Sequence, residues 1–140
     1  MKKSFIMSSG VAVLMVILAG SCQVGGPSDE ELINWTMTDW KAALKARDLD
    51  RLMATYSENY VSARASSKDS VRERMTGIFD RGWMDNVKVN LENAKIKIKG
   101  DKAEFGPVEF ISDEGKFSYE YILQKEYGAW FIVGSKRQEQ

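Results

Sequence analysis

The sequence predicts an α+β domain in which three N-terminal helices pack on a curved, mainly antiparallel sheet. Between Ser28 and Phe79, apolar residues recur at the spacing of amphipathic helices. From Asn86 onward they alternate with polar residues, which is the period of a β-strand. Short turn signals then separate one strand from the next, which favours consecutive hairpins. A sheet bent around helices leaves a cavity at its open end, a common place for small ligands.

Length and composition limit the function classes that fit this chain. Its 140 residues suffice for one domain, and 44% hydrophobic with 29% charged residues is typical of a globular protein. Lys+Arg and Asp+Glu both total 20, so no net charge favours nucleic acid. The chain has no histidine and one cysteine, which removes the commonest general base, any internal disulfide and a thiolate zinc site. We predict no metal site, no cofactor and no nucleic-acid partner.

The N-terminal residues have the pattern of a signal peptide. Lys2 and Lys3 precede the apolar run 11–18, which is far shorter than the roughly 20 residues of a spanning helix. Small residues follow, and Leu18-Ala19-Gly20-Ser21-Cys22 resembles a bacterial lipobox. The resemblance implies that residues 1–21 are removed and that Cys22 carries a lipid. Ordinary cleavage after Ser21 and an uncleaved anchor remain as alternatives.

All three alternatives predict a protein outside the cytoplasm. With a lipidated Cys22, residues 22–28 form a short tether that holds the domain of residues 29–138 close to the membrane. Gln23 rather than aspartate follows the cysteine. In a Gram-negative host this resemblance implies the periplasmic side of the outer membrane.

Cap residues mark the three expected helices. Ser28 and Glu31 form a capping box that opens the first. Asp48 can cap the second, and Ser66 or Ser67 can cap a third that runs to about Phe79. The apolar stripes of the first two are expected at Leu32, Ile33, Thr36, Met37, Trp40, Ala43 and Leu44, and at Leu49, Leu52, Met53 and Tyr56.

Alternating residues mark the strands, at 87–91, 95–99, 103–111, 117–123 and 130–134. Gly106-Pro107 should break or bulge the third of these. Ile96 and Ile98 should share one face, opposite Lys95, Lys97 and Lys99. Together with Lys88 and Lys102, these lysines are expected to form a solvated face, with docking on anionic headgroups as the alternative.

The passage Trp40 to Tyr60 and the final hairpin Glu126 to Gly134 resemble the nuclear-transport-factor-2-like superfamily, as does the order of elements over residues 29–136. The resemblance implies a cone-shaped fold and includes ketosteroid isomerases and SnoaL-like polyketide cyclases. In the isomerases a tyrosine, an aspartate base and a protonated acid catalyse the reaction. Those places fall here at Trp40, at Arg64 and, by a loose alignment, near Tyr121. Since Trp40 is not a tyrosine and Arg64 cannot act as a base, isomerase chemistry is not expected.

Several side chains are candidates for the cavity wall. Aromatic polar ends and one guanidinium could face a ligand, whereas the alternative is that the aromatics are core and that Arg64 points outward. The candidates are Trp40, Tyr56, Tyr60, Arg64, Met75, Tyr119 and Tyr121.

These observations favour a membrane-anchored lipoprotein that binds a small apolar or anionic ligand, or a protein partner, without catalysis. One alternative is a SnoaL-like enzyme acting on a small hydrophobic substrate. Another is a scaffold that forms homodimers through the sheet, with apolar faces offered by Phe110, Tyr119 and Tyr121.

Overall fold

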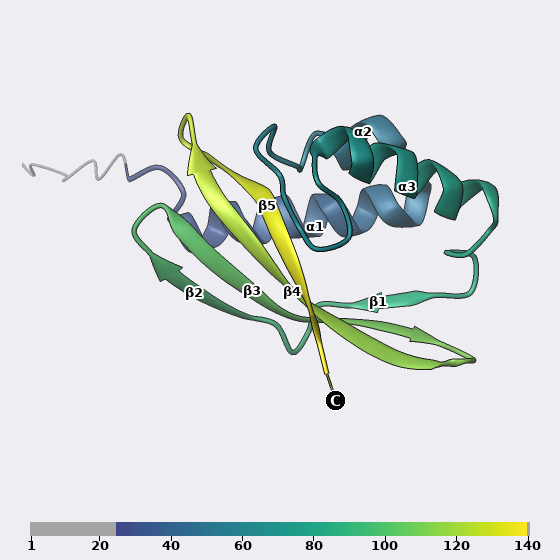
Figure 1. Ribbon diagram of the computed structural model, residues 1–140. Coiled ribbons are helices and arrows are strands. Elements are labelled where there is room, and N and C mark those ends of the chain that lie inside the picture. Colours follow the sequence, from purple (N-terminus) through teal and green to yellow (C-terminus); the bar gives the residue numbers. More distant parts are fainter. Residues whose placement is uncertain (1–24, 140) are drawn as a thin grey trace, which may run out of the picture.

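The computed structural model describes residues 25–139, so the expected signal peptide and Cys22 lie outside the described residues. Within them, three helices precede a five-stranded antiparallel sheet that curves beneath them (Figure 1). The predicted fold class is therefore confirmed. The elements are α1 (Asp29–Ala46), α2 (Leu49–Met53), α3 (Lys68–Asp80), β1 (Lys88–Asn90), β2 (Lys95–Lys99), β3 (Lys102–Ser112), β4 (Gly115–Glu126) and β5 (Ala129–Gln138).

The predicted caps set the helix boundaries. The Ser28 hydroxyl accepts from the Glu31 amide at 3.2 Å, and the Glu31 carboxylate accepts from the Ser28 amide at 2.9 Å. Asp48 caps α2, and Ser67 rather than Ser66 caps α3. The prediction of Tyr56 on the second helical stripe is wrong. α2 ends at Met53, and Tyr56 lies beyond it, in a parallel bridge with Ile132 of β5.

The strand order β1-β3-β4-β5, with β2 also paired to β3, makes β3 and β4 the long central strands. One part of β3 pairs with β2 and the other with β1, and a register shift between Phe105 and Val108 separates the two parts. The Gly106–Pro107 peptide bond there is cis. The predicted bulge is confirmed, and the strand continues through it.

The core lies where α1 and α2 cross the concave face of the sheet. Its innermost side chains, all 0% exposed, include Ile33, Met37, Leu52, Leu123 and Ile132. Polar contacts tie α1 to β5 at the same place. The Thr36 hydroxyl donates to the Trp130 carbonyl at 2.9 Å, and the Trp130 indole donates to Asp29 at 3.0 Å.

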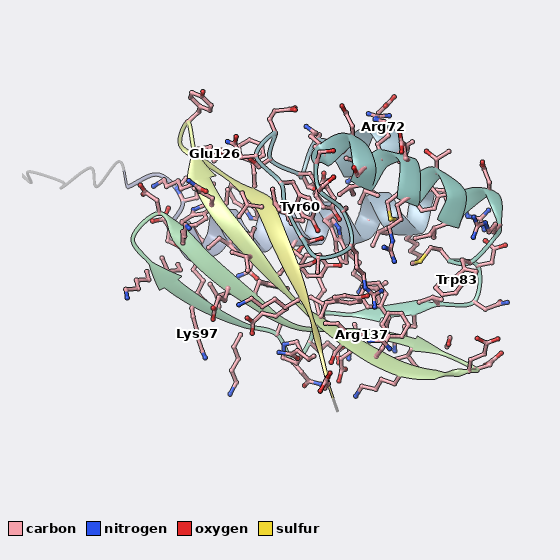
Figure 2. The ribbon with its side chains drawn as sticks, in the orientation of Figure 1. Tyr60, Arg72, Trp83, Lys97, Glu126 and Arg137 are labelled. Carbon is pink, nitrogen blue, oxygen red and sulfur yellow. The ribbon has the colours of Figure 1, made fainter. Side chains whose placement is uncertain are left out.

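β2 is an edge strand, and its burial differs from the expectation. Ile98 is 42% exposed, whereas Ile96 on the same strand packs against the core, so the alternation does not place both in the core. Lys95, Lys97 and Lys99 are exposed, and in Figure 2 Lys97 projects away from α1. Within residues 25–139, no helix has both the length and the apolar composition needed to cross a bilayer.

Candidate functional site

A cavity of about 640 Å³ opens between the sheet and α3, near the right-hand ends of β3 and β4 in Figure 1. The volume lies within the roughly 300–1,000 Å³ of typical small-molecule sites. The segment 82–87, which follows α3, closes one side, and the residue labelled Trp83 in Figure 2 belongs to it.

Aromatic rings line the sheet side of this cavity. Trp40 packs on Tyr121 with ring centroids 4.8 Å apart, and it meets the edge of Phe110 at 6.2 Å. From Tyr121 the contacts continue along β4 through Tyr119 to Phe117, which stacks on Phe110 at 5.1 Å. This closed ring of contacts gives the cavity a rigid apolar floor.

Two hydrogen bonds within the protein use polar groups of residues that line the cavity. The Trp40 indole donates to the Tyr56 hydroxyl at 3.1 Å, and Tyr60 shares a hydrogen bond of 3.1 Å with the Ser135 hydroxyl. The hypothesis that the Trp40 N–H faces a ligand is therefore wrong. Trp40 is 1% exposed, and its only donor is already used inside the protein.

The Tyr121 hydroxyl remains available to a ligand. It has no hydrogen-bond partner among residues 25–139. In that range, every side-chain oxygen or nitrogen that is fully inaccessible to solvent has a partner, so the Tyr121 hydroxyl must be accessible, and it opens onto the cavity. Burial raises the pKa of Tyr121 well above its usual value, and the neighbouring Tyr56 and Tyr60 raise it further. At neutral pH Tyr121 is therefore a neutral hydrogen-bond donor in apolar surroundings.

Burial likewise raises the pKa of Tyr56, against a smaller lowering effect of the hydrogen bond from Trp40. Two neutral phenols therefore lie together at the inner end of the cavity, and no carboxylate of residues 25–139 lines that end. The lining carboxylates, Asp113 and Glu114, lie on the exposed β3–β4 turn. Among residues 25–139, this end of the cavity therefore presents phenol groups that can donate a hydrogen bond.

All the cavity candidates of the sequence line this one cavity, although they come from different elements. The lining includes Trp40, Tyr56, Tyr60, Arg64, Met75, Tyr119 and Tyr121. Arg64 is exposed, in agreement with the alternative that it points outward. Its guanidinium nevertheless lies 5.7 Å from the centre of the Tyr119 ring, at the outer end of the cavity, which we call the mouth. That these side chains contact a ligand stays a prediction.

Other lining residues were missed by the sequence reasoning. Ser135 and Arg137 line the cavity from β5, because they pair in register with Tyr121 and Tyr119. The alternation of the last strand could have revealed them, but that strand was predicted to end at Gly134. Trp83 has no comparable signal, because it lies in a turn.

The apolar faces proposed for homodimer contact are not on the outer sheet. Phe110 and Tyr121 are 8% and 7% exposed and face Trp40, and Tyr119 lines the cavity. The expectation that these three residues form a dimer surface is wrong, because their side of the pleat points toward the helices. Pairing of two copies through the sheet stays a prediction without them.

No family model matches the sequence, and no curated protein matches it. Solved structures do match. A protein of unknown function from Pseudomonas putida, described as nuclear-transport-factor-2-like, has a TM-score of 0.65 and 16% identity, covering 82% of this chain and 90% of that one. A second such protein, from Shewanella oneidensis, has a TM-score of 0.63 and 14% identity, covering 80% and 100%. The chain has the nuclear-transport-factor-2-like fold.

A third match with this fold is a protein from Novosphingobium aromaticivorans, described as a candidate aromatic ring hydroxylase. Its TM-score is 0.60 and its identity 16%, and the match covers 79% of this chain and 87% of that one. Identities this low show the nuclear-transport-factor-2-like fold alone. Since one fold hosts many functions, the function has to be argued from the cavity itself.

Proposed function

We propose that the protein is a lipoprotein, anchored outside the cytoplasm, whose nuclear-transport-factor-2-like domain binds a small, largely apolar molecule without transforming it. The observation that carries the proposal is the cavity of about 640 Å³, in which an aromatic floor lies beside the buried Tyr121 hydroxyl, which has no hydrogen-bond partner among residues 25–139. Such a site can bury an apolar body and orient it by one hydrogen bond. The non-catalytic part is supported by the lining, in which the carboxylates of the described residues, Asp113 and Glu114, lie on the exposed turn and not at the inner end.

The binding part is tested with N-phenyl-naphthylamine, an uncharged dye that fluoresces in apolar sites. We expect the purified protein to bind about one dye per chain, since the lining belongs to one cavity. Met75 lines the cavity from α3, whereas the neighbouring Thr76 is exposed. Met75→Trp should fill the site and abolish binding, and Thr76→Trp should leave it unchanged. Absence of dye binding, or equal binding by both variants, contradicts the proposal.

The anchor rests on the lipobox-like sequence that ends at Cys22. Bacteria that express the full chain should incorporate an alkyne-labelled fatty acid into it, and Cys22→Ala should abolish the labelling. A labelled Cys22→Ala variant, or an unlabelled wild-type chain, rejects the anchor. Either result leaves the binding proposal untouched.

A second candidate function is an enzyme that acts on a small hydrophobic substrate. Tyr121 favours it, because a neutral phenol in an apolar cavity can polarise a carbonyl oxygen. Native mass spectrometry of the protein purified from its host shows the mass of a retained small molecule and the oligomeric state together. Recovery of that molecule unchanged after incubation with fresh protein supports binding, whereas its conversion supports the enzyme.

A further inference from the structure

The cavity mouth carries arginine side chains with no anionic partner. Within residues 25–139, three arginines pair with carboxylates, namely Arg47 with Asp85, Arg51 with Asp39 and Arg72 with Asp50. Three of the remaining arginines, Arg64, Arg74 and Arg137, line the cavity and form no ion pair with a described residue. Of the four arginines without an ion pair among residues 25–139, three therefore line this cavity, and only Arg81 lies elsewhere.

Two of these guanidinium groups are held by aromatic rings of the floor. Arg64 lies 5.7 Å from the centre of the Tyr119 ring, and Arg137 lies 5.5 Å from the centre of the Phe117 ring. The two rings are themselves 5.9 Å apart. A guanidinium over a ring keeps its N–H groups free at the edge, so both arginines have donors available to a ligand.

The positions of these groups define the shape of the ligand. Tyr119 and Tyr121 lie on the same face of β4, and their register partners on β5 are Arg137 and Ser135. Tyr119, the position beside the arginines, therefore lies two residues along β4 from Tyr121, whose ring contacts Trp40. The lining acids Asp113 and Glu114 lie on the turn beyond Phe117, and the lining Lys116 is paired with Glu109.

We infer that the cavity binds an amphipathic carboxylate, with the carboxylate at Arg64 and Arg137 and the apolar body on the aromatic floor. The planar fork of a guanidinium matches the two oxygens of a carboxylate. This inference rests on the proposed binding function and adds the chemical class of the ligand.

Displacement of N-phenyl-naphthylamine by decanoate and by decanol tests the inference, because the two compounds share an apolar chain and differ in charge. We expect decanoate to bind about tenfold more tightly than decanol at low salt, since charge-assisted bonds act on it alone. Added salt should reduce this preference, because the arginines are exposed at the mouth.

The double variant Arg64→Gln/Arg137→Gln should lose the preference for decanoate and retain the affinity for decanol. Arg72→Gln/Lys97→Gln removes the same charge from the outer face of α3 and from β2, and it should keep the preference (Figure 2). Equal binding of both compounds by the wild-type protein overturns the inference, as does a preference that survives in the Arg64/Arg137 variant. If the protein binds neither the dye nor decanoate in calorimetry, the proposed function fails as well.

Discussion

The concave face of the sheet has two halves that differ in how they are covered. In the packed half, α1 contributes five buried residues, and Leu123 and Ile132 beneath it are 0% exposed. In the open half, α3 contributes only Val71 as a buried residue, and Phe117 and Tyr119 are only partly buried. The same strand, β4, runs through both halves. Burial is therefore set by the helix above the strand and not by the strand sequence.

This difference separates stability from binding within one sheet. Close packing in the first half supplies the free energy of folding, since buried apolar area dominates stability. The second half leaves aromatic surface uncovered, which costs stability and leaves room for a ligand. Substitutions in the packed half should therefore change mainly the free energy of unfolding, and substitutions in the open half should change mainly the affinity for a ligand.

The largest expected effect comes from truncating one residue of β4 in each half. Leu123→Ala should lower the free energy of unfolding by about 3 kcal/mol, because a fully buried leucine leaves a cavity. Phe117→Ala should cost only about 1 kcal/mol, since the ring is already partly exposed at the mouth. Urea unfolding measures both. Dye affinity should change in the reverse order, and equal stability losses would erase the distinction between the halves.

The bulge where the two halves meet should be sensitive to one added methyl group. A Cβ on Gly106 would lie 3.1 Å from both the Glu120 Cα and the Tyr119 carbonyl oxygen on β4. Because backbone atoms cannot move aside easily, Gly106→Ala should cost about 1 kcal/mol of unfolding free energy. Gly77→Ala is the control. A Cβ there meets nothing nearer than 3.8 Å, and alanine should stabilise α3 by about 0.5 kcal/mol. Thermal unfolding of both variants gives the signs, and a neutral Gly106→Ala contradicts the close contact.

A smaller and pH-dependent effect is expected behind the open half. The hydrogen bond from Lys116, supported by Asn90 at 3.0 Å, lowers the pKa of Glu109 below its usual value, although burial opposes this. A carboxylate whose pKa is lowered in the folded state stabilises the protein fully above the ordinary glutamate pKa of about 4.3. That contribution is lost as the pH falls below this value and through the lowered folded-state pKa.

The stability difference between wild type and Glu109→Gln should therefore be present at neutral pH and narrow in acid. Urea unfolding at a series of pH values measures it. Glu92→Gln serves as a control, because the Glu92 side chain is exposed and makes no hydrogen bond to a described residue. A difference that stays constant with pH would rule out the assigned contribution of the Glu109 charge.

The sequence predicted well what is local and poorly what depends on the partner element. Ser28 with Glu31, and Asp48, fix helix starts through bonds to residues three positions away, so a single sequence reveals them. The exposure of Ile98 depends on what covers β2 in the folded chain, and the hydrogen bond from Trp40 to Tyr56 joins α1 to the segment after α2. Neither follows from periodicity. Tyr119 and Tyr121 could be grouped because alternate residues of β4 share a face, whereas Trp83 has no such pattern.

The smallest expected effect on stability comes from two surface ion pairs, one beside each half of the sheet, whose removal should differ in local opening. Two surface ion pairs have nearly equal exposure, Arg47–Asp85 at 48% and 44% and Arg51–Asp39 at 46% and 43%. Because both pairs are solvated, Asp85→Asn and Asp39→Asn should each change the free energy of unfolding by less than about 0.5 kcal/mol. Amide hydrogen exchange should nevertheless separate them.

Asp85 lies in the segment 82–87 that closes the cavity, where turn hydrogen bonds such as Val87 to Met84 at 3.4 Å provide the other support. Asp85→Asn removes the ion pair with Arg47 and should speed amide hydrogen exchange in that segment, since few other contacts oppose its local opening. Asp39 lies on α1, which the buried core already holds, so Asp39→Asn should leave exchange in α1 and α2 unchanged. Equal exchange in the two variants would mean that the rim of the open half is held as firmly as the packed core. In that case entry of a ligand would require opening of α3 and not of the segment that follows it.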